Sequence, residues 1–269
     1  MKKTIKRWGK TLMIAFLGIG LAAFTSCTKE DNGGNGNNGG STDQWANLVN
    51  ETTHEAIVNG NTLTYGDHVY TVNGEFDYSS YVYNQPTAYV TFTNIPSGFT
   101  EFAAVYNNLL GKSPQGVAAM IPMAFEIYAR NNATGEKCLN LLCWSSAVPD
   151  IIRELKQKFV PSQYASANDQ YVQRYLPAAV MKGAANTNAY KPEEPYTVEM
   201  CASPNGIQDA PLTGGTVYYT YILAPGGWDT FQRSVEIIQA YGANEYKVFN
   251  CPATYSQCKV IQGTWQGLK

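Results

Sequence analysis

The period of the hydrophobic residues changes twice along this chain, and no other sequence feature restricts the fold class as strongly. Residues 54–96 alternate between apolar and polar positions and carry turn signals at Asn59-Gly60, Gly66-Asp67 and Asn73-Gly74. Helical spacing follows, and from Pro195 onward the alternation returns. This order predicts an α+β fold with N-terminal β-hairpins, a central helical segment and a C-terminal antiparallel sheet of about four strands.

The central segment contains the strongest helix signals. In "VPDIIRELKQKFV", residues 148–160, Pro149 suits the first turn, and Ile151, Leu155 and Phe159 share one face. Residues 100–111, 113–131 and 134–144 also have helical spacing, with Thr100 as the expected N-cap of the first stretch. Pro122 is expected to kink or split the second stretch.

The first 26 residues have the layout of a secretory signal. Five basic residues precede an apolar stretch, residues 12–24, which is too short to cross a bilayer as a mature helix. The small residues before Cys27 resemble the lipobox of bacterial lipoproteins, in which the cysteine is acylated. The alternative is an ordinary signal peptide with an incidental cysteine. Acylation at Cys27 would anchor the protein stably in a membrane.

The residues after Cys27 indicate a surface location. Lys29, Glu30 and Asp31 resemble the surface-export signal of outer-membrane lipoproteins from gut anaerobes, although they could be only a solvated charge cluster. Residues 32–40 are glycine and asparagine, which form a flexible linker. We expect a signal in residues 1–26, the lipidated end and linker in 27–44, a β-rich region in 45–98 and an α+β domain in 99–269. The expected location is the outer membrane, with the domain on the cell surface.

Charge excludes one class of partner. The signal contributes five of the 19 basic residues and no acidic residue, so residues 27–269 carry 14 basic and 21 acidic residues, a net charge of −7. Nucleic-acid binding requires a basic face. We therefore expect no nucleic-acid partner.

Five cysteines remain besides Cys27, an odd number that cannot pair completely within one chain. A disulfide that uses Cys251 and buried thiols throughout are both compatible with the sequence. The chain contains no C-x-x-C motif, and we expect neither a metal site nor a cofactor.

Catalytic motifs are scarce. The two histidines are His54 and His68, and no G-x-S-x-G or similar nucleophile motif accompanies them. The stretch "TYGDHVY" is typical of a hairpin turn that contains Asp67. Carboxylates that are distant in the sequence could still meet in a cleft, so a hydrolase stays open as an alternative.

Aromatic residues are the strongest candidate for ligand binding. The stretch "TVYYTYILAPGGWDTF" places Tyr218, Tyr219 and Tyr221 on a predicted strand and Trp228 in the following loop. Alternation sends Tyr219 and Tyr221 to one face and Tyr218 to the other. These residues could form an exposed platform for sugar rings, or they could form an aromatic core face.

The stretch "YLPAAVMKGAANTNAYKPEEPYTVEM", residues 175–200, resembles a family of secreted and lipid-anchored bacterial proteins that is catalogued as a domain of unknown function. The segments "EFAAVYNNLL" and "RSVEIIQAYGANEYKVFNCPATY" are similar to the first helical unit and last strand of that family, so the resemblance covers about residues 99–262. The stretch "AAVMKGA" and the cysteines depart from the family pattern. The resemblance implies one α+β domain in the cell envelope and transfers no catalytic residue.

These observations favour a non-catalytic module that binds an extracellular glycan or peptide. The first alternative is an envelope structural or assembly protein that contacts another protein. The second is the hydrolase with dispersed carboxylates.

Overall fold

The computed structural model describes residues 48–159 and 172–269, so the predicted lipidation site Cys27 and the predicted export signal at Lys29, Glu30 and Asp31 lie outside the described residues. An antiparallel sheet and four α-helices make up the α+β fold that the sequence predicts. The strands are β1 (Ala56–Asn59), β2 (Thr62–Tyr65), β3 (His68–Gly74), β4 (Ala88–Phe92), β5 (Tyr196–Ala210), β6 (Gly215–Leu223), β7 (Gln232–Ala240) and β8 (Tyr246–Asn250).

The N-terminal hairpins and the C-terminal strands form one eight-stranded sheet, whose strand order follows the chain from β1 to β8. The junction is the antiparallel pair β4–β5, in which Val90 lies opposite Val198. Both residues are fully buried. The expected C-terminal sheet of about four strands is therefore half of a larger sheet, because short hairpins gain stability only when further strands or helices cover their apolar face.

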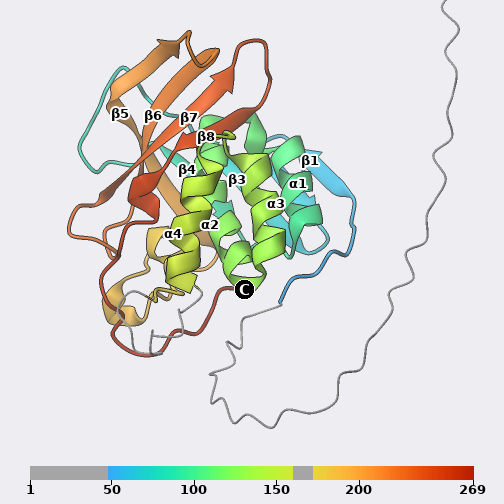
Figure 1. The fold of residues 1–269 in the computed structure, drawn as a ribbon, viewed down its shortest axis with the longest axis vertical. Coiled ribbons are helices and arrows are strands. Elements are labelled where there is room, and N and C mark those ends of the chain that lie inside the picture. Colours follow the sequence, from blue (N-terminus) through green and yellow to red (C-terminus); the bar gives the residue numbers. More distant parts are fainter. Residues whose placement is uncertain (1–47, 160–171) are drawn as a thin grey trace, which may run out of the picture. The chain divides into compact units, whose positions relative to one another are not determined.

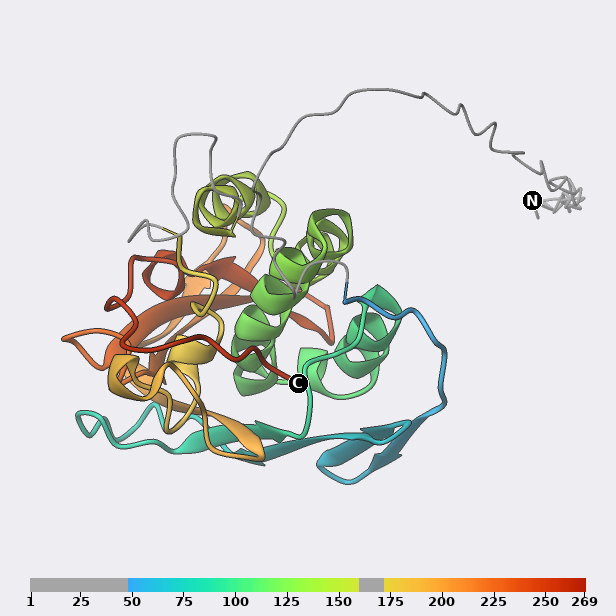
Figure 2. The same ribbon diagram turned by 90° about the horizontal axis from the view of Figure 1, so that it is seen from below.

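The sheet bends around helix α2 (Pro114–Arg130), which contacts β4, β7 and β8 (Figures 1 and 2). Every residue of α2 except Pro114 and Ala129 is buried, as expected of a helix that is apolar on all sides. The remaining helices are α1 (Phe99–Asn108), α3 (Asn132–Leu142), α4 (Val148–Phe159) and the short 3-10 turns η1 (Leu110–Lys112), η2 (Ala178–Val180), η3 (Asn186–Asn188) and η4 (Pro252–Thr254).

Two predicted details of the helices differ from the structure. Helix α2 continues through Pro122 and is not split there, because packing on all sides outweighs the local cost of proline. Helix α1 begins at Phe99, after an N-cap at Gly98, and not after Thr100. The carboxylate of Glu51 caps this helix by accepting hydrogen bonds from the backbone N–H of Phe99 (3.0 Å) and Thr100 (2.8 Å).

The cysteines of the described residues are free and buried, so the disulfide considered for Cys251 is not formed. Burial raises the pKa of the Cys251 thiol to about 12, which leaves it protonated and unreactive at neutral pH. These thiols therefore pack as small apolar groups.

The C-terminal segment closes one side of the core. Lys269 accepts a backbone hydrogen bond from Ile95 (2.8 Å), and the Leu268 carbonyl accepts one from the Arg130 guanidinium (2.8 Å). Leu268 itself is buried. Among the residues that the structure describes, no helix combines the length and apolar character needed to span a bilayer.

Candidate functional site

The loop between β3 and β4, residues 75–87, occupies a position that a strand would otherwise fill. Strand β5 is 15 residues long, but its pairing with β4 extends only to Met200. Beyond that point the loop lies beside β5, starting where the Thr87 N–H donates to the Met200 carbonyl (2.9 Å). The loop, teal in Figure 1, therefore builds a surface together with β5 and β6.

A hollow of about 140 Å³, open to solvent, lies between this loop and β5. It mixes apolar and polar groups and contains no basic side chain. Such a mixture, apolar surface with a few oriented polar groups, is typical of small-molecule sites. We call it the loop–β5 hollow; its residues are Asp77, Ser80, Tyr81, Val82, Gln85, Thr87, Cys201 and Ala202.

Two tyrosines border the loop–β5 hollow. The ring of Tyr81 lies 6.4 Å from the ring of Tyr221, which stands opposite Cys201 in the β5–β6 register. The Tyr81 hydroxyl accepts a hydrogen bond from the Gln232 amide (2.8 Å), which holds the ring in place. Tyr81 keeps 38% of its surface exposed, and Phe231, next to Gln232, keeps 41%. The hollow therefore has an aromatic rim accessible from solvent.

Some polar atoms of the loop have no partner within the described residues, and one of them belongs to Thr87, which lines the hollow. Thr87 Oγ1 and, on the same loop, Asn84 Oδ1 are shielded from solvent and make no hydrogen bond. A buried polar atom without a partner costs about 1–3 kcal/mol. Because no hydrogen bond of the described residues offsets this cost, a ligand at this position is worth considering.

Asp77 supplies a negative charge to the hollow. Its Oδ1 accepts hydrogen bonds from the Ser79 hydroxyl (2.6 Å) and from the backbone N–H of Ser79 (2.9 Å) and Ser80 (3.2 Å). These bonds, with the Ser79 hydroxyl foremost, lower the pKa of Asp77. The carboxylate is therefore ionised at neutral pH, and all three bonds end on Oδ1 rather than Oδ2.

The four aromatic residues predicted as a platform do not form one surface. Trp228 is only 7% exposed, and the Arg233 guanidinium covers its ring at 4.8 Å from the centroid. Tyr218 packs on the core side, 5.3 Å from the Tyr246 ring and 6.2 Å from the Tyr78 ring. Trp228 is therefore buried beneath a cation, and Tyr218 is partly buried against neighbouring rings, so neither presents a free ring face to solvent.

Tyr219 and Tyr221 lie on the opposite face of β6, as strand alternation predicts. Of the predicted residues, Tyr221 is the one that approaches the loop–β5 hollow, through its contact with Tyr81. Sequence reasoning missed Tyr81 because Tyr81 and Tyr221 are 140 positions apart in the chain and meet only through tertiary packing. The cluster of tyrosines in "DYSSYVYN", residues 77–84, was the available signal.

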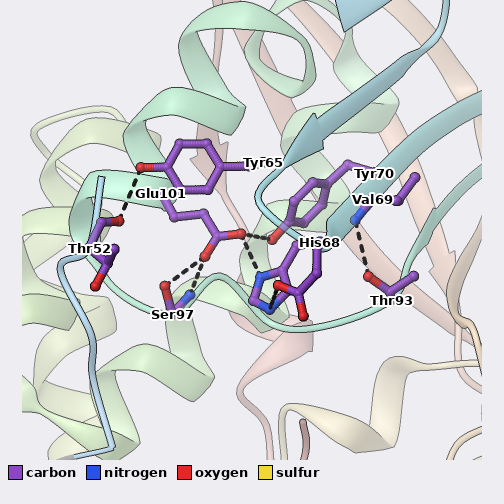
Figure 3. Close-up of polar contacts among 9 residues, drawn as sticks. Thr52, Tyr65, His68, Val69, Tyr70, Thr93, Ser97 and Glu101 are labelled. Atoms are coloured by element: carbon purple, nitrogen blue, oxygen red, sulfur yellow. Dashed lines mark hydrogen bonds and ion pairs between the residues drawn. The ribbon is translucent and has the colours of Figure 1, made fainter. Parts of the chain in front are cut away.

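A second polar cluster surrounds Glu101 in the first turn of α1 (Figure 3). The carboxylate is 1% exposed and accepts four hydrogen bonds, each 2.7 Å long. Burial alone would raise the pKa of Glu101, but the hydrogen bonds, with His68 foremost, lower it below its usual value. The donors are His68 Nδ1, the Tyr70 hydroxyl, and the backbone N–H and hydroxyl of Ser97.

The cluster resembles an oriented acid–base pair but serves the fold. The bond to Glu101 raises the pKa of His68, and the Asp67 carboxylate lies 3.8 Å from its Nε2. A catalytic imidazole needs a nucleophile or a substrate pocket at its free nitrogen. Within the described ranges, no serine, threonine or cysteine bonds to Nε2, and His68 lines neither the loop–β5 hollow nor the hollow between residues 146–151 and 249–255. We conclude that Glu101 fastens the β2–β3 hairpin to α1.

A third polar cluster consists of the buried Glu126 and two arginines. Glu126 is fully buried and accepts hydrogen bonds from Arg130 (2.8 Å) and Arg174 (2.7 Å). Because Arg130 also bonds the Leu268 carbonyl, this cluster connects α2 to the C-terminal segment. In the part of the chain that the structure describes, no group of three histidine, cysteine, aspartate or glutamate residues is arranged to hold a metal ion.

Comparison with protein families identifies the domain. The model of the domain of unknown function DUF6935 matches residues 94–262, which is more than half of the chain. The chain belongs to the DUF6935 family. No curated protein and no solved structure matches it.

The DUF6935 match begins after the loop that forms the hollow. Cys201, Ala202 and Tyr221 lie within the matched residues, whereas Asp77, Tyr81 and the rest of the loop precede them. The same boundary divides the Glu101 cluster, since His68 and Tyr70 also precede residue 94. Both sites therefore combine DUF6935 residues with residues from the preceding strands and loops.

Proposed function

We propose that this protein is an outer-membrane lipoprotein, acylated at Cys27, whose folded domain binds an extracellular ligand at the cell surface without catalysing a reaction. The observation that carries the binding role is the loop–β5 hollow, with its aromatic rim and the unpartnered hydroxyl of Thr87. The sequence of residues 1–44 carries the anchoring role, through the lipobox-like cysteine and the linker.

The arrangement of Tyr81 and Tyr221 supports binding rather than catalysis. Tyrosine rings provide large, rigid contact area at low conformational cost. The buried carboxylates of Glu101 and Glu126, by contrast, are engaged in bonds that hold the fold together. They give the hydrolase alternative no support.

The anchoring part is tested in cells of the source organism or a related anaerobe. Palmitate labelling followed by proteinase K treatment of whole cells should give a labelled protein that protease removes rapidly. Cys27→Ser should lose the label. A labelled protein that resists protease until the cells are broken would refute the surface location and place the domain in the periplasm.

The binding part is tested with the full chain, purified in detergent, on arrays that carry both glycans and peptides. We expect a binder whose signal falls at least tenfold in Tyr81→Ala. Tyr83→Ala is the matched control, because Tyr83 is on the same loop, is 65% exposed and does not line the hollow. Equal loss in both variants, or loss in neither, would contradict a binding role for the hollow.

A second candidate function is an envelope assembly role, favoured by an exposed apolar tip. Leu212, in the turn between β5 and β6, is fully exposed, and Ile207 and Tyr241 keep about half of their surface exposed. The Tyr241 N–H donates to the Gly214 carbonyl, so the two turns are adjacent. Cross-linking in intact cells that captures one stoichiometric protein partner, and loses it in Leu212→Ser, would favour this role.

A further inference from the structure

We infer that the loop–β5 hollow recognises a single uncharged pyranose ring of a glycan, with Tyr81 as the stacking platform and Asp77 and Thr87 as hydrogen-bonding groups. This inference rests on the proposed ligand-binding function and assigns a chemical class to the ligand. Four properties of the hollow lead to it: its size, its charge, its unpartnered hydroxyl and the way the loop covers the side of β5.

Size limits the ligand to a small unit. Sites for drug-sized molecules have volumes of roughly 300–1,000 Å³. The loop–β5 hollow, at about 140 Å³, holds one ring and leaves the rest of a longer chain outside, over the exposed surfaces of Tyr81, Val82 and Phe231.

Charge limits the ligand to a neutral or cationic group. Asp77 is the one charged residue among the eight that line the hollow, and it is ionised at neutral pH. An anionic ligand such as a phosphate, a sulfated sugar or a peptide carboxylate would meet this charge without a basic partner, which is unfavourable. A neutral sugar would donate hydroxyl hydrogens to Asp77 Oδ2, and hydrogen bonds to a carboxylate are stronger than those between neutral groups.

The combination of a ring and hydroxyl partners matches a sugar. The face of a tyrosine ring carries partial negative charge, which attracts the C–H groups on the apolar face of a pyranose. The edge of the same sugar carries hydroxyls that both donate and accept. Thr87 lines the hollow, and its Oγ1 is shielded from solvent and has no partner, so a sugar hydroxyl that reaches this atom after a small side-chain shift would complete its hydrogen bonding.

A peptide fits this place less well. Extended peptides are recognised most often by adding a strand to a free sheet edge. At the loop–β5 hollow the first group beyond the β4 pairing, the Met200 carbonyl, already accepts the Thr87 N–H. Cys201 and Ala202, the next residues of β5, are only 3% exposed, so little of the adjoining strand is open to a peptide.

The test uses the full chain in detergent and an array of neutral hexose and pentose oligosaccharides, with sialylated and sulfated glycans and peptides printed beside them. We expect binding to neutral saccharides, and a loss of about tenfold in Thr87→Val and in Tyr81→Ala, with no loss in Tyr83→Ala. Thr87→Val keeps the shape of the side chain and replaces the hydroxyl with a methyl group. Its melting temperature should therefore equal or exceed that of the wild type, so that lost binding cannot be attributed to unfolding.

The outcomes separate this inference from the proposed function. Peptide or anionic-glycan binding that Tyr81→Ala abolishes would overturn the pyranose assignment and keep the ligand-binding role. Neutral-saccharide binding that is unchanged in Thr87→Val and Tyr81→Ala would overturn the assignment to this hollow. An array with no binder in any class would overturn both.

Discussion

Glu101 shows how one buried carboxylate connects parts of the chain that the sequence separates. Its partners His68 and Tyr70 are on β3, whereas Ser97 immediately precedes α1. We predict that Glu101→Gln lowers the free energy of unfolding by about 3 kcal/mol, because the amide replaces one acceptor oxygen with a donor that faces existing donors. Urea unfolding measures the change. The control, Glu55→Gln on the exposed approach to β1, should change it by less than about 0.5 kcal/mol.

The hydrogen-bonded pair of His68 and Glu101 also predicts how the stability of the fold depends on pH. The pKa of His68 is raised in the folded state, so its contribution is complete below its unfolded value of about 6.5 and is lost as the pH rises through the folded value. The pKa of Glu101 is lowered, so its contribution is lost as the pH falls below about 4.3. We therefore expect the urea midpoint to decrease as the pH rises above about 6.5. A His68→Asn variant that keeps the same decrease would refute the assignment.

Residue-scale chemistry was the part of this protein least accessible from its sequence. The turn at Asp67 was predicted correctly from "TYGDHVY". Glu101, which bonds His68 after that turn, is 33 positions further along the chain, and no local pattern joins His68 to Glu101. Trp228 illustrates the opposite difficulty. The sequence of a glycine-rich loop does not show whether an aromatic residue in it is exposed or buried. Trp228 is buried because the Arg233 side chain covers its ring.

At the scale of elements, the contact of α3 with α2 depends on the absence of a side chain. A Cβ placed on Gly135 would lie 2.1 Å from the Tyr128 Cα, which is backbone and cannot turn aside. Glycine to alanine in a helix ordinarily stabilises by about 1 kcal/mol. We predict the reverse sign for Gly135→Ala, a loss of about 2 kcal/mol from overpacking. Thermal and urea unfolding measure it beside Asn140→Ala on the exposed side of α3, and a gain in stability would contradict the close approach.

The elements themselves were largely predictable because their periodicity is strong. Helices α3 and α4 and the strands around Pro195 follow from spacing, caps and turn residues. The loop of residues 75–87 was not predictable as a site. Its sequence contains polar residues and tyrosines without a period. Its role arises because β4 begins only at Ala88, opposite Met200, while β5 continues beyond Met200 to Ala210.

At the scale of the whole molecule, the α+β class was confirmed, and the continuous sheet is what the period changes alone could not reveal. Two β-rich segments on either side of a helical segment are compatible with two sheets or with one. The β4–β5 pairing selects one sheet, since Ala88, Val90 and Phe92 on β4 are almost completely buried beside α2. Strand order is set by long-range packing, which local patterns do not encode.

This continuity predicts that the matched DUF6935 region cannot fold without the strands that precede it. A chain that begins at residue 94 lacks β1–β4, which exposes the inner face of α2 and leaves β5 without a paired strand along residues 196–199. It also lacks His68 and Tyr70, two of the donors to the buried Glu101 carboxylate. We expect this fragment to show no cooperative thermal transition, whereas a chain that begins at residue 45 should unfold cooperatively, because it retains all eight strands. Circular dichroism melts of the two chains make the comparison, and a cooperative transition at the same temperature in both would show that β1–β4 are an accessory to an independent domain.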